Sequence, residues 1–568
     1  MKRFNLSLVS GSAATALIIA LAVLVQAQQR DLATVIQAGE TKQALERIRT
    51  GADVNQAQRD GTTPLIWAVN RSDHDVVEAL LAKKANPNAV NEFGVMPLTE
   101  AARLNDARMV KMLLDAGAKV DSANPDGETA LMLAIKGGNL PIVETLVNAG
   151  ANVNTVETFH TQTPLIYATA AGRADVVRLL LSKGADVKPR ALYSDWPSQV
   201  TSEPRTQYRS VGGLNALLYS ARAGCYECAE QLIAAGADVN IPTPEGITPL
   251  MIALDNSNND VAKLFIQKGA HLHVWDWWGR TALWIAVDRK PPAGGGSGGL
   301  GGGLGRGGQG GRGGQGGRGA GPGANAAAPQ RSDRPAVSND EIIKILLDAG
   351  ADPNVEMNFH RPNDARSGRG RFGDNQISTG TTPLFRAVQL NDLGVAQSLL
   401  EKGANPNINT MGYTSFLWAA GVTAGRGGGG PVSLAMVNLL TQHSADVNAK
   451  VTGTKTYSFY TSYTEDRNPS NTEGLSALHG AARSGNLDLV KFLLDHGADP
   501  NLLDADGKKP IDVVGVPTRG GRAGQGKAPA AAPGGGKGKG GAGGPGENPA
   551  TLAEIRSLLQ AASAKRLP

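Results

Sequence analysis

One short segment recurs along this chain, a Gly-Ala pair followed by a polar stretch that usually ends in Asn. Clear copies begin at Gly51, Gly150, Gly236 and Gly497. A fixed repeat is the signature of a solenoid or a related array, so it constrains the fold more than any other feature. There are 11 copies, of which the degenerate ones begin at Lys84, Gly117, Gly184, Gly269, Gly350, Gly403 and Ser444.

A second motif, Thr-Pro-Leu or a close variant, keeps step with the first. Leu65, Leu98 and Leu131 close three successive copies, and each interval is 33 residues. Departures from this period between a Gly-Ala turn and the next Thr-Pro-Leu mark insertions. They predict three inserted loops, at residues 189–213, 355–380 and 449–472.

Each unit is expected to contain two short helices. In the unit from 126 to 154, Thr129 is predicted to cap the first helix, and Gly137-Gly138 to end it. Apolar residues at helical spacing predict a second helix, which Gly150 ends in the left-handed conformation. Two such helices cannot bury their apolar faces alone, so stability must come from stacking.

With these motifs, most of residues 30–562 resembles the ankyrin-repeat family, as an exported bacterial-type array with Gly-rich insertions. The resemblance implies an all-α repeat solenoid of about 12 helix-turn-helix/β-hairpin units, with the three inserted loops on its β-hairpin fingers. The His that follows Thr-Pro-Leu in the family remains at His479, whereas Ile66 and Trp284 are among its apolar replacements. Apolar packing is therefore expected to replace the inter-repeat hydrogen bond of that His.

The repeat boundaries give a domain organisation. Residues 28–59 suit an N-terminal capping repeat, and residues 549–568 a C-terminal capping helix. Ankyrin repeats are expected at 60–290 and 339–513. The Gly-rich stretches 291–338 and 514–548 are expected to be disordered linkers, because they contain little that could be buried.

The first residues indicate export. Lys2 and Arg3 precede a short apolar run and a small-residue site at Ala27, which is typical of a secretory signal at residues 1–27. An uncleaved N-terminal anchor is the alternative. We expect a periplasmic or extracellular, monomeric protein with no stable membrane insertion after cleavage.

The net charge of +5 is unevenly distributed. The two Gly-rich stretches contribute +4 each and the signal contributes +2, which leaves −5 for the rest of the chain. The basic balance therefore does not predict nucleic-acid binding by the repeats. Arg306 and Arg312 lie in Gly-Arg-Gly-Gly segments and Arg318 in a Gly-Arg-Gly-Ala segment. Such segments resemble the Arg-Gly-Gly segments of RNA-binding proteins, and a flexible linker with solubilising charge is the alternative.

Aromatic residues on the fingers, and on the groove that the resemblance implies beside them, are the candidate contacts for a protein partner. Exposed aromatic side chains are typical of binding hot spots. The groove position is the second residue after the Leu of Thr-Pro-Leu, where packing between repeats is the alternative role. The predicted contact residues are Trp277, Trp278, Tyr460, Tyr463, Trp196, Tyr219, Tyr167 and Trp67.

Few residues could support chemistry. Cys225 and Cys228 have the Cys-x-x-Cys spacing of thiol oxidoreductases. A local disulfide is the alternative, with Cys228 in an apolar slot and Cys225 at the solvent-facing start of a helix. His271 and His273 form a weak zinc signal that lacks a third ligand, so no metal or other cofactor is predicted.

No catalytic motif is present. The sequence therefore favours a non-enzymatic protein–protein interaction scaffold that binds a partner of unknown identity. Two alternatives are a thiol redox protein using Cys225 and Cys228, and an accessory subunit of a periplasmic enzyme.

Overall fold

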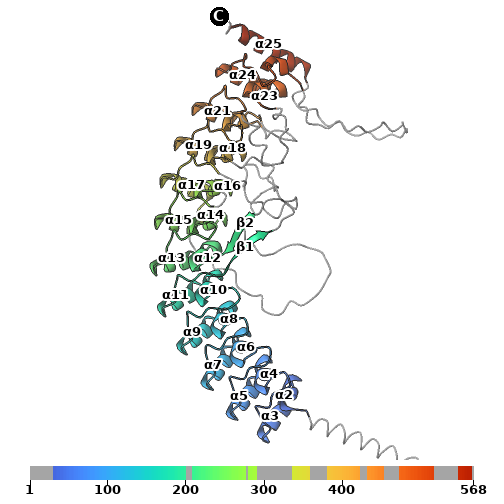
Figure 1. Ribbon diagram of the computed structural model, residues 1–568, viewed down its shortest axis with the longest axis vertical. Coiled ribbons are helices and arrows are strands. Elements are labelled where there is room, and N and C mark those ends of the chain that lie inside the picture. Colours follow the sequence, from blue (N-terminus) through green and yellow to red (C-terminus); the bar gives the residue numbers. More distant parts are fainter. Residues whose placement is uncertain are drawn as a thin grey trace, which may run out of the picture. The chain divides into compact units, whose positions relative to one another are not determined.

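The structure is a computed structural model that describes residues 30–199, 207–276, 279–290, 336–357, 380–422, 432–452, 472–516 and 548–565. The described chain forms two compact units, residues 30–238 and residues 239–565. In each unit, paired antiparallel helices stack so that first helices form one row and second helices the other (Figure 1). This confirms the expected ankyrin-type solenoid.

The described part of unit 1 contains six helix pairs. The first helices of these pairs are α2 (Leu32–Gln37), α4 (Pro64–Asn70), α6 (Pro97–Arg103), α8 (Ala130–Gly137), α10 (Pro164–Ala170) and α12 (Ala216–Ala223). The second helices are α3 (Thr41–Arg49), α5 (His74–Ala82), α7 (Ala107–Asp115), α9 (Leu140–Asn148), α11 (Ala174–Ser182) and α13 (Tyr226–Ala234).

The described part of unit 2 also contains six pairs. The first helices are α14 (Pro249–Asp255), α16 (Ala282–Asp288), α18 (Pro383–Gln389), α20 (Ser415–Ala419), α23 (Ala477–Ser484) and the 3-10 helix η3 (Pro510–Val513). The second helices are α15 (Asn259–Gln267), α17 (Asn339–Asp348), α19 (Leu393–Glu401), α21 (Leu434–Gln442), α24 (Leu487–Asp495) and α25 (Pro549–Lys565).

The predicted start and stop signals operate as expected. The Thr129 hydroxyl accepts a hydrogen bond from the backbone N–H of Met132 and so caps α8. Gly138 ends the same helix at φ 76°, and Gly150 follows α9 at φ 91°. Both glycines adopt the left-handed conformation that side chains with a Cβ disfavour.

The core lies between the two rows of helices. On α8, Leu131, Met132 and Ile135 are fully buried, and on α9 Ile142 and Leu146 are fully buried. In unit 1, each first helix contacts its own second helix and the first helices of the neighbouring repeats of that unit. In unit 2, α14, α16, α18 and α20 contact their own second helices and one another in sequence. The apolar face of one repeat is therefore covered only when its neighbours are folded.

The loop between each Gly-Ala turn and the next first helix is here called a finger. The finger insertion predicted at 189–213 contains an antiparallel hairpin of β1 (Tyr193–Gln199) and β2 (Gln207–Gly212), with a register shift between Trp196 and Gln199 (Figure 1). Most of the other two predicted insertions, and most of both Gly-rich linkers, lie outside the described residues.

The ends of the two linkers differ slightly from the prediction. Ser338 falls within the first predicted linker, but its hydroxyl accepts from the backbone N–H of Glu341 and caps α17. Val514 falls within the second predicted linker, but its side chain is buried. Its carbonyl accepts a hydrogen bond from Arg556 on α25, so the chain remains packed beyond Val513.

The Asn that ends each repeat landmark links one turn to the next. Nδ2 of Asn88 donates to the carbonyl of Gly117 at 3.0 Å, and Oδ1 of Asn88 accepts from the N–H of Lys119 at 2.7 Å. We call the series of such bonds the amide ladder. The same two bonds are made by Asn55, Asn154, Asn240, Asn354, Asn407 and Asn448.

Three landmarks depart from the amide ladder. Asp121 accepts from the N–H of Asn152 at 2.8 Å but, as a carboxylate, has no proton to donate. Lys188 and His273 occupy the ladder position in two other repeats. Among the described residues, neither side chain is hydrogen-bonded to the following Gly-Ala turn.

The His that follows Thr-Pro-Leu and its replacements behave partly as expected. His479 closes a capping box with Ser476, and its Nε2 lies 3.0 Å from the Lys508 carbonyl in the next repeat. Ile66 is buried, as apolar packing requires. Trp284, however, also restores an inter-repeat bond, because its Nε1 donates to the Thr381 hydroxyl at 3.1 Å.

We predict that ladder bonds can be removed and added by substitution. Asn88→Ala removes two hydrogen bonds and should lower the free energy of unfolding by about 1–2 kcal/mol. Asp121→Asn should raise it by about 0.5–1 kcal/mol, because an amide can donate to the next turn as Asn88 does. Urea unfolding of the full chain checks both, and a stabilised Asn88→Ala or a destabilised Asp121→Asn would contradict the ladder.

Candidate protein-binding surface

The groove positions of unit 1 form a stripe on successive first helices. We call Trp67, Glu100, Leu133, Tyr167 and Tyr219 the groove stripe; they lie on α4, α6, α8, α10 and α12. Four of these side chains are fixed by polar contacts that an isolated helix could not make. Trp67 is half-buried, and its Nε1 donates to Oε1 of Gln58 in the preceding finger at 2.8 Å.

Glu100 is held by two neighbours. Its carboxylate accepts from Nδ2 of Asn70 at 2.7 Å and forms a two-point ion pair with Arg103 at 2.6 and 2.8 Å. Burial alone raises the pKa of Glu100, but the hydrogen bonds from Arg103 and Asn70 outweigh burial and hold the pKa below its ordinary value. The carboxylate therefore stays charged within the stripe.

Tyr167 lies at the centre of a second polar cluster. Its hydroxyl donates to Oε1 of Glu128 at 3.0 Å, and Nζ of Lys136 contacts the same oxygen at 2.7 Å. Lys136 also lies 5.5 Å from the centroid of the Tyr167 ring, within cation–π distance. Burial and the neighbouring Glu128 carboxylate raise the pKa of the Tyr167 hydroxyl, which therefore remains a donor.

Tyr219 offers less surface than the sequence suggested. Its side chain is only 9% exposed, and its hydroxyl accepts a hydrogen bond from Nε2 of Gln162 at 3.0 Å. The guanidinium of Arg222 lies 4.6 Å from the ring centroid. At this position the packing role dominates, whereas Trp67 and Tyr167 keep part of their rings accessible.

The fingers of unit 1 expose large apolar side chains that the sequence did not single out. Phe93 is 64% exposed and Phe159 is 67% exposed. Leu192, at the base of the hairpin, is also exposed, as is Tyr193, an aromatic residue that the insertion predicted at 189–213 already placed on a finger. The sequence offers only one signal for this exposure, an aromatic residue in a predicted loop. Because a loop has no hydrophobic periodicity, the sequence alone does not distinguish an exposed aromatic residue there from a buried one.

Backbone hydrogen bonds hold neighbouring fingers together. The N–H of Glu92 donates to the Asp60 carbonyl at 2.8 Å, and the N–H of Thr158 donates to the Asp126 carbonyl at 2.9 Å. The N–H of Leu192 donates to the His160 carbonyl at 2.6 Å. Phe93 and Phe159 therefore each lie on a finger that is hydrogen-bonded to a neighbouring finger.

A buried carboxylate fixes the finger that carries Phe159. The Glu157 side chain is 1% exposed, and it accepts backbone N–H bonds from Phe159, His160 and Gln162 at 2.6 to 2.9 Å. Because these bonds to the buried carboxylate fix the backbone of the loop, the Phe159 side chain is held in its outward position.

Several predicted contact residues cannot be placed on this surface. Trp277, Trp278, Tyr460 and Tyr463 lie outside the described residues, so their contact role stays a prediction. Trp196 lies in β1, but its side chain is outside the described part.

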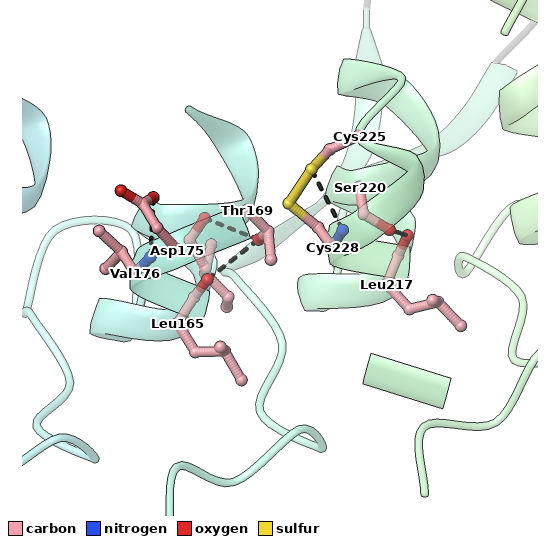
Figure 2. Close-up of a disulfide and its surroundings, with 9 residues drawn as sticks. Leu165, Thr169, Asp175, Val176, Leu217, Ser220, Cys225 and Cys228 are labelled. Atoms are coloured by element: carbon pink, nitrogen blue, oxygen red, sulfur yellow. Dashed lines mark hydrogen bonds between the residues drawn. A yellow bond between two sulfur atoms is a disulfide. The ribbon is translucent and has the colours of Figure 1, made fainter. Parts of the chain in front are cut away.

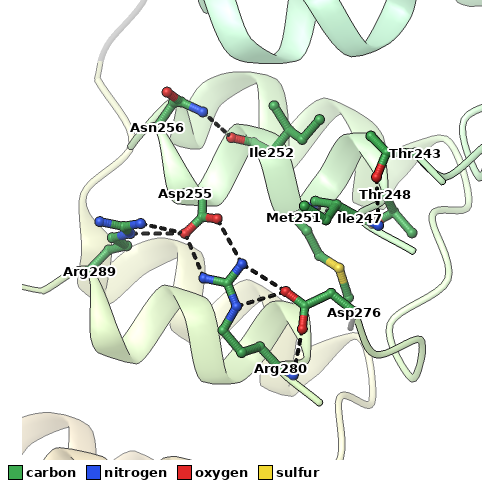
Figure 3. A network of polar contacts seen from close by, with 10 residues as sticks. All are labelled: Thr243, Ile247, Thr248, Met251, Ile252, Asp255, Asn256, Asp276, Arg280 and Arg289. Atoms are coloured by element: carbon green, nitrogen blue, oxygen red, sulfur yellow. Dashed lines mark hydrogen bonds and ion pairs between the residues drawn. The ribbon is translucent and has the colours of Figure 1, made fainter. Parts of the chain in front are cut away.

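The groove positions of unit 2 have a different character. Ile252, Ile285 and Arg386 are all buried there, and Nε of Arg386 contacts Oδ1 of Asp288 at 2.7 Å. Beside them, Arg280 bridges Asp276 and Asp255, and Asp255 also pairs with Arg289 at 2.8 Å (Figure 3). Burial alone raises the pKa of Asp255, but the two arginines hold it below its ordinary value. The positive and negative charges of these ion pairs therefore balance one another inside unit 2.

Cys225 and Cys228 form a disulfide at the start of α13 (Figure 2). Cys228 fills a fully buried apolar slot, as expected. The expectation that Cys225 faces solvent is wrong, because its side chain is 7% exposed and its N–H donates to the Ser220 carbonyl at 3.1 Å. Cys225 takes the helix-capping place that Asn139 holds at α9. Such burial hinders attack by an external thiolate.

The weak zinc signal finds no support in the described part of the chain. There, no group of three or more His, Cys, Asp or Glu side chains is arranged to hold a metal ion. The backbone N–H of His271 instead donates to Asn240 as a rung of the amide ladder. Within the same described residues, no helix combines the length and apolarity needed to cross a membrane.

We predict that the Tyr167 hydroxyl stabilises the charged form of Glu128. Burial alone raises the pKa of Glu128, but hydrogen bonds from Lys136 and Tyr167 hold it below its ordinary value. The resulting stabilisation is present above the unfolded-state pKa and is lost as pH falls through the folded-state pKa. Tyr167→Phe should therefore raise the Glu128 pKa and reduce stability at neutral pH by about 1–2 kcal/mol.

Unfolding by urea between acidic and neutral pH measures this difference. The cost of Tyr167→Phe should shrink as Glu128 becomes protonated. Thr145→Val, which removes an exposed hydroxyl bonded to the Pro141 carbonyl, serves as a pH-independent control. A Tyr167→Phe cost that does not change with pH would contradict the assignment.

Comparison with known proteins agrees with this architecture. The family model described as "Ankyrin repeats (3 copies)" matches residues 32–124, 98–191 and 209–292. The model described as "Ankyrin repeat" matches residues 379–410 and 473–505. Together these matches span more than half of the chain.

Individual relatives match over part of their length. The E3 ubiquitin-protein ligase KEG of Arabidopsis thaliana is 27% identical over 265 residues, 44% of this chain and 13% of that protein. The B-cell lymphoma 3 protein homolog of Mus musculus is 27% identical over 147 residues, 22% of this chain and 33% of that protein. The neurogenic locus notch homolog protein 1 of Danio rerio is 35% identical over 215 residues, 33% of this chain and 7% of that protein. The chain thus spans no more than a third of these relatives. The matches to the two ankyrin models place it in the ankyrin-repeat family.

Proposed function

We propose that this chain is a non-enzymatic scaffold that binds a protein partner through the fingers of unit 1 and the adjoining groove stripe. Ankyrin repeats generally mediate protein–protein interactions. The distribution of exposed apolar side chains is the observation that supports this particular surface. Of the eleven large apolar side chains exposed in the described chain, six lie on the fingers of unit 1: Val90, Phe93, Val156, Phe159, Leu192 and Tyr193.

The energetic argument favours a binding role for these fingers. Burying one exposed phenylalanine contributes about 1.5–3 kcal/mol, and several neighbouring ones can anchor an interface. The backbone bonds between fingers and the buried Glu157 carboxylate fix Phe93 and Phe159 before any partner arrives. Ordering costs on binding are consequently small.

The groove stripe supports the same face. Trp67 and Tyr167 keep part of their rings accessible, while their polar atoms are bonded inside the fold. A partner therefore meets aromatic surface without having to satisfy the indole N–H or the phenol hydroxyl. The neighbouring Arg103 and Lys136 side chains, each about half exposed, surround this surface with polar groups.

The thiol redox alternative has less support than the scaffold. Both cysteines are buried, and Cys225 is used to cap α13. An accessory subunit differs from a simple scaffold only in the identity of its partner, which would be an enzyme. Identification of the partner therefore separates these two functions.

To test the binding face, we expect Phe93→Asp combined with Phe159→Asp to reduce recovery of the partner that co-purifies with the tagged wild-type protein by at least about tenfold. The melting temperature should stay within about 2 °C, because both side chains are largely exposed. Quantitative mass spectrometry of the co-purified material measures the loss.

The matched control is Leu393→Asp combined with Leu434→Asp. These residues are also exposed, at 39% each, but they lie at the first positions of α19 and α21 rather than on fingers. The control should keep the partner. Equal recovery with the finger variant and the control would refute the assignment of this face.

We also propose that the protein is exported. The charged and apolar segment before Ala27 supports this, although it lies outside the described residues. The Cys225–Cys228 disulfide supports it independently, because disulfides persist mainly in oxidising compartments. Cell fractionation with N-terminal sequencing should yield a mature chain that begins at Gln28; a cytoplasmic, full-length chain would argue against export.

A further inference from the structure

A cleft of about 340 Å³ lies between two successive fingers of unit 2. Trp275 and Gly279 line it from the finger that follows α15. Asn354, Val355 and Glu356 line it from the finger that follows α17. The cleft is distinct from the groove stripe and lies on residues that the proposed partner surface in unit 1 does not use.

The wall that carries Trp275 is rigid. Its neighbour Asp276 is buried, and the Asp276 carboxylate accepts from Nε of Arg280 at 2.7 Å and from the N–H of Arg280 at 2.9 Å. The Asp276 carbonyl also accepts from the N–H of Gly279 at 2.8 Å. Figure 3 shows how Arg280 joins this turn to Asp255 on α14.

This arrangement leaves Trp275 on the outside of a fixed turn. Its side chain is 62% exposed, which is unusual for tryptophan because the exposed ring surface is large and apolar. The buried ion pairs hold the turn, so the indole face is available without rearrangement of the finger.

The opposite wall presents a carboxylate. Met357 is fully buried, and its N–H donates to the Thr381 carbonyl at 3.0 Å, which fixes the backbone beside Glu356. The Asn354 side chain is engaged with Gly403 and Asn405 in the amide ladder. Among the described residues, no cation or donor pairs with the Glu356 carboxylate. Partial burial raises its pKa above the ordinary value, as expected for a carboxylate without a counter-charge.

A largely exposed tryptophan and a carboxylate that line one cleft from successive fingers share a ligand chemistry. An indole face attracts cations, and a carboxylate binds a guanidinium by two parallel hydrogen bonds. A guanidinium can also stack flat on the ring, whereas an ammonium acts as a point charge. We propose that the Trp275–Glu356 cleft binds an arginine side chain of the protein partner.

This inference rests on the proposed scaffold function, but it can be tested without the partner. The full chain is labelled with 5-fluorotryptophan, and the Trp275 resonance is assigned by its loss in Trp275→Phe. N-acetyl-arginine-amide is the probe, and N-acetyl-glutamine-amide is the neutral control. The arginine probe should shift the Trp275 resonance saturably, and the glutamine probe should not.

Substitutions separate the two walls. Glu356→Gln should weaken binding of the arginine probe about three- to tenfold, through loss of the charge. Asp352→Asn changes a nearby exposed carboxylate of the same finger that does not line the cleft, and it should leave binding unchanged. Trp275→Leu should abolish binding of the arginine probe. In this variant, binding is measured by calorimetry.

Three results would overturn the inference. The first is a Trp275 resonance that does not move at about 100 mM probe, far above the millimolar dissociation constant expected for one side chain. The second is an equal shift with the glutamine probe, and the third is tighter binding of N-acetyl-lysine-amide than of the arginine probe. None of these results bears on Phe93 and Phe159, so failure here is distinguishable from failure of the proposed function.

Discussion

The repeats of this protein cannot complete their own interactions. The amide of Asn88 finds both of its partners in the next turn, and the apolar faces of α8 and α9 are covered by neighbouring helices. Stability therefore belongs to the stack, as nearest-neighbour contacts require. The same rule explains why the chain can interrupt a repeat between its two helices, as between α16 and α17, while the pair still packs together.

The two units use this framework differently. In unit 1 the groove positions carry aromatic and charged side chains whose polar atoms are bonded to neighbouring repeats, and the fingers expose Phe93 and Phe159. In unit 2 the corresponding positions on α14, α16 and α18 are buried, and Arg280, Asp255 and Arg289 form a compensated network. On the described fingers of unit 2, Trp275 lines a cleft.

Short-range signals made much of the fold predictable. Thr129 and Gly150 act within one turn of their own helix, so their roles follow from residue type and spacing. Exposure depends on distant neighbours and could not be predicted in this way. Tyr219 is covered because Gln162 and Arg222 reach it, whereas Phe159 is exposed because Glu157 closes its loop from inside. Trp284 was treated as an apolar replacement, yet its indole N–H found Thr381 across an insertion.

Lys188 and His273 stand where other repeats place the asparagine of the amide ladder. At these two seams the cross-link between consecutive turns is absent among the described residues, and the repeats are joined by helix packing and by polar contacts away from the turns, such as Gln162 to Tyr219 at the first seam and Arg280 to Asp255 at the second. Under mechanical load, the edge formed by the Gly-Ala turns would therefore separate first beside Lys188 and His273, while those other contacts still hold the helices of the two repeats together.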